Sequence, residues 1–114
     1  MKYESINEYT DKEIMDILYY GSESELKNIA LSVGEFHQSY RFAQDVCFFL
    51  LDHSNEDVRA NAILGLSYIA RRFKELDIKK LKLLLRQQKA FSEKNTERVQ
   101  YALEDISLFL NEHF

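Results

Sequence analysis

The side chains most often used for metal binding and nucleophilic catalysis are few in this sequence. It contains three histidines, His37, His53 and His113, and one cysteine, Cys47. No histidine has another histidine or a cysteine at helical spacing, whereas a structural zinc site usually needs four ligands. His53 and Asp57 are four residues apart, but a predicted turn separates them. These histidines are therefore interpreted as polar turn residues, and we expect no metal and no cofactor.

Nucleophilic and phosphate-binding motifs are not found either. Cys47 lies beside Phe48 and Phe49 in an apolar segment, which predicts a buried, inert thiol. No serine lies in a GxSxG turn. No GxxxxGKS or GxGxxG loop occurs, and the chain has only 3 glycines. We therefore expect a protein that is not an enzyme.

The composition predicts one helical domain spanning residues 1–114. Hydrophobic residues make up 46% of the 114 residues and charged residues 30%, which is sufficient for a core of its own. Proline is absent, so few residues would break a helix. No apolar run reaches the roughly 18 residues of a membrane span, and the N-terminus lacks an apolar signal core. With a single cysteine no internal disulfide can form, and we expect a cytoplasmic protein without membrane contact.

Apolar residues recur every three or four positions in six segments, which predicts six helices. These helices would position the residues of any site. The clearest helix spans residues 54–73, where Ser54 and Asp57 have the spacing of an N-terminal cap. Its apolar stripe predicts one packed side, and its other side, which includes Ala60, is expected to be open. The apolar stripe is Val58, Ala62, Leu66, Ile69 and Phe73.

The remaining helices are predicted from capping residues and apolar spacing. Thr10 and Ser22 each precede a glutamate by three residues, which predicts two capping boxes. Gly21 is predicted to end the first helix, and the second is predicted to end at Gly34 or, where Glu35 and Phe36 continue the turn, at Phe36. The third helix is expected over about residues 40–52, the fifth after Asp77 and the sixth from about Thr96, following a polar linker over residues 91–96.

The predicted helices repeat in pairs. At a shift of 32 residues, Leu26 aligns with Val58 and Ala30 with Ala62, and at a shift of about 41 Val99 aligns with Val58. Three helix pairs with a period of 30–40 residues are typical of an α-solenoid. The repeats are predicted at about residues 10–36, 40–73 and 77–112.

The segment LLDHSNEDVRANAILGLSYIA resembles a HEAT repeat. The matching positions are Leu50, Leu51, Asp52, Val58, Arg59, Ala62 and Leu66. The first repeat has Lys27 where the family has arginine, the third has Gln100, and none has the usual proline. The resemblance implies a short right-handed α-solenoid of about three antiparallel helix pairs. It also implies that a partner binds the concave surface formed by the second helix of each pair.

The expected contact residues lie on the second helices, over residues 22–36, 57–73 and 96–112. At 100° per residue, the sides opposite the apolar stripes are polar or small, and Tyr68 flanks them. The predicted set is Asn28, Ser32, Glu35, Ser67, Tyr68, Arg71, Gln100, Glu104 and Asn111. Tyrosines at the stripe edges, such as Tyr19, Tyr20 and Tyr101, either complete the core or anchor a partner.

The net charge of −4 conceals an asymmetry that indicates the kind of partner. Residues 1–57 contain 12 acidic and 4 basic side chains, and residues 58–114 contain 7 and 11. An acidic surface attracts basic proteins and repels nucleic acid. Small, acidic, helical-repeat proteins resemble bacterial immunity proteins, so we expect an inhibitor that binds a basic toxin, such as a nuclease domain.

Two other functions remain open at this point. One is nucleic-acid binding through a basic series between residues 71 and 89, which we expect less because exposed aromatic residues do not interleave with it. The other is a general adaptor or assembly scaffold. The basic series is Arg71, Arg72, Lys74, Lys79, Lys80, Lys82, Arg86 and Lys89.

Overall fold

All the regular structure of the described chain is helical. The computed structural model describes residues 6–113, and within that range it contains six α-helices and no strand. The Cα radius of gyration, 13.1 Å, is close to the ~13 Å of a compact 100-residue domain. The expectation of an all-α fold with six helices is therefore confirmed. The helices are α1 Asp11–Tyr20, α2 Glu23–Phe36, α3 Tyr40–Leu50, α4 Glu56–Phe73, α5 Ile78–Gln87 and α6 Glu93–Leu110.

Local capping fixes the start of three helices as predicted. Thr10 and Ser22 form capping boxes at α1 and α2, in which the hydroxyl accepts the N3 backbone N–H and the N3 glutamate accepts the cap N–H. The Asp77 carboxylate accepts the Lys80 N–H at 3.1 Å and caps α5. Each cap satisfies a backbone donor that the helix leaves unpaired.

Two predicted helix starts are wrong. Asn55, not Ser54, caps α4, because its Oδ1 accepts the N–H groups of Asp57 at 2.8 Å and Val58 at 3.1 Å. The sixth helix starts at Glu93 rather than Thr96. Its first turn was mistaken for linker because its polar side chains gave no apolar period.

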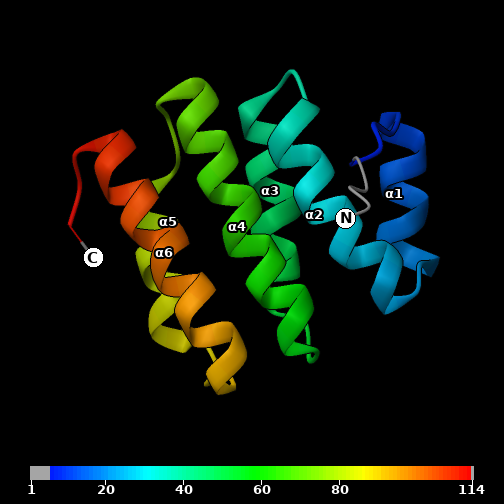
Figure 1. Cartoon of the computed structure of the whole chain (residues 1–114). Helices are drawn as coiled ribbons and strands as arrows, with labels where there is room; N and C mark the ends of the chain where they lie inside the picture. Colours follow the sequence, from blue (N-terminus) through cyan, green and yellow to red (C-terminus); the bar gives the residue numbers. More distant parts are fainter. Residues whose placement is uncertain (1–5, 114) are drawn as a thin grey trace, which may run out of the picture.

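Helices α2, α4 and α6 lie in one row, as Figure 1 shows. Helix α4 is at the centre and packs against α2 on one side, α6 on the other, and α3. Helix α1 packs mainly against α2 at the end of the row. The turns that join α1 to α2, α3 to α4 and α5 to α6 all lie along the lower edge in Figure 1.

The side of helix α4 that was predicted to be open is largely buried. Eleven of its 18 residues are buried, including Arg59, Ala60 and Ser67. The prediction of one open side was wrong because it assumed a single packing partner, whereas α2, α3 and α6 cover three sides of α4. Only a narrow strip of this helix reaches the surface.

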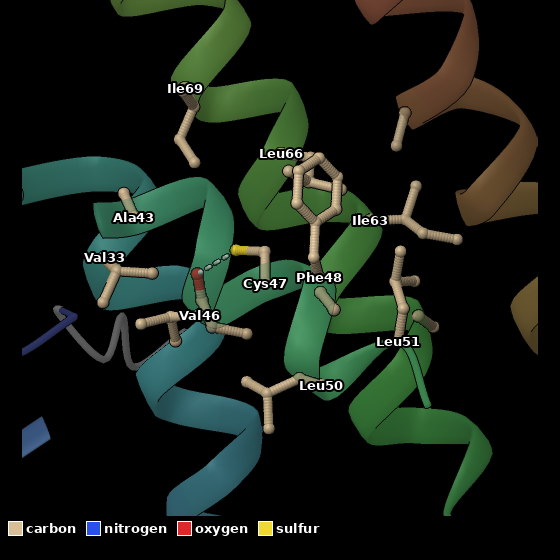
Figure 2. Close-up of a cluster of buried hydrophobic side chains, with 14 of the residues drawn as sticks. Val33, Ala43, Val46, Cys47, Phe48, Leu50, Leu51, Ile63, Leu66 and Ile69 are labelled. Atoms are coloured by element: carbon tan, nitrogen blue, oxygen red, sulfur yellow. Dashed lines mark hydrogen bonds between the residues drawn. The ribbon is translucent and has the colours of Figure 1, made fainter. Parts of the chain in front are cut away.

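Helices α2 and α4 approach closely at Gly34 and Gly65. A Cβ on Gly34 would lie 2.5 Å from the Gly65 carbonyl oxygen, and one on Gly65 would lie 2.9 Å from the Cys47 Sγ. Helix α2 continues past Gly34 to Phe36, in agreement with the predicted range of residues 22–36. Figure 2 shows the apolar core beside this contact, with the Cys47 Sγ directed at the Ala30 carbonyl oxygen of α2.

No helix within residues 6–113 has the length and hydropathy needed to cross a bilayer.

Candidate protein-binding surface

The nine predicted contact residues do not share one exposed face. Ser32 and Ser67 are buried, and their hydroxyls donate to the carbonyl oxygens of Asn7 and Leu64, both at 2.6 Å. These two positions cannot contact a partner in this conformation. The other seven reach the surface to different degrees: Asn28, Glu35, Tyr68, Arg71, Gln100, Glu104 and Asn111.

Part of the predicted set forms a connected patch on α2 and α4. Arg71 donates to the Glu35 carboxylate at 3.1 Å, and its guanidinium lies 5.1 Å from the centre of the Tyr68 ring. This arrangement holds a cation, a carboxylate and an aromatic ring together across α2 and α4. Glu35 and Arg71 are 36 residues apart in the sequence. Glu35, Tyr68 and Arg71 therefore form one connected group on α2 and α4.

The predicted residues of α6 reach the surface, and other side chains of this helix bond to α4. Gln100, Glu104 and Asn111 are exposed, and Asn111 ends the helix in the left-handed conformation at φ 55°. The side chains of α6 that bond to α4 are Lys94, Asn95 and Arg98. The apolar stripe by itself does not say which side of α6 faces α4, so these three residues remain predicted contact candidates.

A polar hollow lies between the N-terminal halves of α2, α4 and α6, and sequence reasoning missed it. Its volume is about 530 Å³. The Asn61 amide donates to the Lys27 carbonyl oxygen at 3.2 Å and accepts from Arg98, so one side chain links all three helices. The lining residues are Ser24, Lys27, Asn28, Asp57, Asn61, Lys94, Asn95 and Arg98.

Two carboxylates at the start of α4 are held in their charged form. The Asn95 amide donates to Asp57 at 2.7 Å, and this bond, with help from Lys94 at 3.5 Å, lowers the pKa of Asp57. The Ser92 hydroxyl and backbone N–H both donate to Glu56 and lower the pKa of that carboxyl. These bonds connect the start of α4 to the start of α6, and Asp57 also lines the hollow.

The best candidate for catalytic chemistry is a histidine that the sequence did not connect to an acid. His37 Nε2 lies 2.8 Å from Asp11, and Ser32 lines the same cavity, which measures about 210 Å³. However, Nδ1 accepts the Ser39 N–H at 3.0 Å, and the Ser32 hydroxyl donates to Asn7. Both ring nitrogens are therefore engaged, and the serine does not bond to the imidazole as nucleophilic catalysis requires.

Cys47 is fully buried, and burial raises the pKa of its thiol. A buried neutral thiol packs as a small apolar group. Within residues 6–113 no group of three or more potential ligands is placed to hold a metal ion.

Several residues of the basic series contact other parts of the protein. Arg72 donates to the carbonyl oxygens of Gly34 at 2.9 Å and His37 at 2.8 Å, at the end of α2. Lys82 lies 3.7 Å from Glu112, and Lys74 lies 4.4 Å from the centre of the Phe109 ring. These residues fasten neighbouring elements together, which leaves fewer of them to follow a phosphate backbone.

Exposed aromatic residues occur away from the predicted set. Tyr19 and Tyr20 at the end of α1 are 75% and 88% exposed, and Met15 on the same helix is 40% exposed. The sequence placed the tyrosines at a stripe edge but could not separate a core role from a surface role. The structure places both in solvent.

Comparison with known proteins gives a fold and no family. No family model and no curated protein matches this chain. Its structure is similar to a chain in the crystal structure of a CDI complex from Cupriavidus taiwanensis LMG 19424, with a TM-score of 0.77 and 19% sequence identity. The likeness covers 96% of this chain and 97% of that chain, so the two share the complete arrangement of helices.

Proposed function

We propose that this protein is a non-catalytic protein-binding module that acts in the cytoplasm as an immunity protein and neutralises a cognate toxin. The observation that supports this most is the structural likeness over 96% of the chain to a component of a CDI complex. CDI denotes contact-dependent inhibition, in which a toxin and its immunity protein form a complex. At 19% identity the likeness extends to the fold, and the function is our inference from it.

The fold that we propose is a short right-handed α-solenoid of three HEAT-like helix pairs. The row of α2, α4 and α6 in Figure 1 and the pairing of α4 with both of its neighbours support this reading. Each pair covers one side of the next, as the repeat at 32 residues predicts. The array then presents its row of second helices as a partner surface, with the exposed predicted residues as contact candidates.

The partner that we propose is a basic toxin domain, such as a nuclease. The first half of the chain has a net charge of −8, which would speed association with a basic domain and discourage nucleic acid. Blocking a toxin requires a tight interface and no chemistry from the inhibitor. That requirement fits a chain in which both ring nitrogens of His37 are hydrogen-bonded and Cys47 is buried.

The test is co-expression with the product of the gene immediately upstream. We expect the two proteins to co-purify and the toxicity of the upstream product to be suppressed in cells that express this chain. Binding should weaken as the salt concentration rises, because the attraction is between opposite charges. An upstream product that neither co-purifies nor binds in isothermal titration calorimetry would refute the proposal, and a salt-dependent shift of duplex DNA or RNA would favour the nucleic-acid reading.

A further inference from the structure

The end of the molecule formed by α1 combines exposed aromatic side chains with excess negative charge. Ile14 is the buried residue of this helix, and its main helix contact is with α2. The fold therefore uses one side of α1. Met15, Asp16 and Tyr19 lie at the three- and four-residue spacings that place them on one exposed side of this helix.

The aromatic part of this surface is unusual for a solvated helix. Tyr19 and Tyr20 are 75% and 88% exposed, and their ring centres lie 6.2 Å apart. With Met15 they form the acidic aromatic edge, defined here as Met15, Asp16, Tyr19 and Tyr20. Tyrosine and methionine are enriched at protein interfaces, and clustered exposed apolar groups mark such sites.

The charge around this edge indicates what kind of partner would bind it. Residues 8–25 contain six acidic side chains and one basic side chain. The hollow on the α2–α4–α6 row differs, because Lys27, Lys94 and Arg98 line it together with Asp57. A basic domain would be attracted to the α1 end and would meet cations at the hollow.

We infer that the acidic aromatic edge of α1 supplies the anchoring contacts for a basic protein partner. This inference rests on the proposed function and specifies which contacts supply most of the free energy of binding the partner. Tyr19 and Tyr20 are the anchors, and Asp16 pairs with a cation of the partner. The exposed residues of the α2–α4–α6 row, including Tyr68 and Arg71, then add contacts beside this anchor.

The experiment measures the affinity of the upstream gene product for wild type and for three variants by surface plasmon resonance. We expect Tyr19→Ala with Tyr20→Ala to raise Kd at least about tenfold, as loss of an aromatic anchor does. Tyr101→Ala removes a tyrosine of α6 that is also well exposed, at 60%, and should change Kd less than about threefold. Asp16→Lys should slow association and reduce its salt dependence.

The outcomes separate this inference from the proposed function. If wild type does not bind the upstream product, the proposed function fails, and the inference fails with it. If wild type binds and the tyrosine variant binds equally well, only the anchoring role of α1 is refuted. Thermal unfolding of each variant shows whether it is folded. If the double tyrosine variant is unfolded, the affinity of Asp16→Lys decides whether α1 anchors the partner.

Discussion

Replacing Gly65 with alanine tests the close contact between α2 and α4. On an isolated helix, glycine to alanine stabilises by about 1 kcal/mol, because alanine loses less backbone entropy. At this site the added Cβ would lie 2.9 Å from the Cys47 Sγ and closer still to the Ala30 carbonyl oxygen. The backbone oxygen belongs to α2, so the clash can be relieved only by moving one helix away from the other.

The expected free-energy change is the difference between these two effects. Forcing an extra carbon into a packed core costs typically 1–3 kcal/mol, and a backbone obstacle places this case near 3 kcal/mol. Subtracting the helix gain leaves a net loss of about 2 kcal/mol. For a chain of this length that lowers the midpoint of thermal unfolding by about 8 °C.

The assay is thermal and urea unfolding of Gly65→Ala beside Asn28→Ala. Asn28 is exposed on α2, so its replacement should shift the free energy of unfolding by no more than ~0.5 kcal/mol. A Gly65→Ala protein as stable as wild type, or more stable, would show that helix propensity outweighs the contact. The reasoning about the α2–α4 spacing would then be wrong.

Three further predictions concern single residues. Asn55→Ala should lower the free energy of unfolding by about 1 kcal/mol by removing the cap of α4, whereas Ser54→Ala should leave it nearly unchanged, both measured by urea unfolding. The hydrogen bonds from Ser92 lower the pKa of Glu56 in the folded protein. The stabilisation that they give is therefore complete above the ordinary glutamate pKa and is lost as the pH falls through the pKa of the folded protein. Glu56→Gln should accordingly flatten the acid limb of a curve of unfolding free energy against pH. The pKa of the buried Cys47 thiol is raised, so a thiol reagent should label it at the rate of unfolding, and rapid labelling of the native protein would contradict its burial.

Much of the fold could be predicted because it depends on local chemistry. The hydroxyls of Thr10 and Ser22 and the glutamates three residues later specify two helix starts without help from distant residues. Asn55 was missed because Ser54 is an equally good capping residue one position earlier, and only the path of the chain decides between them. The start of α6 was missed because it has no apolar periodicity. Its polar side chains Ser92 and Asn95 bond to Glu56 of α4 instead.

The candidate surface was harder to predict because exposure depends on neighbours. Ser67 looked like a surface residue, yet α4 is covered on three sides and the serine is buried. Tyr19 and Tyr20 occupy positions that a further helix pair could have covered. They are exposed because α1 lies at the end of the row.

The sequence by itself determined the six helices, several of their caps and the unequal distribution of charge, since capping, apolar spacing and side-chain ionisation act over a few residues. Only the tertiary structure decided which sides of those helices reach solvent. It brought Gly34 to Gly65, engaged Arg72 at the end of α2, and left the tyrosines of α1 exposed. The physical reason is that burial is a property of two packed surfaces, and a periodic stripe on one helix does not say how many neighbours will cover it.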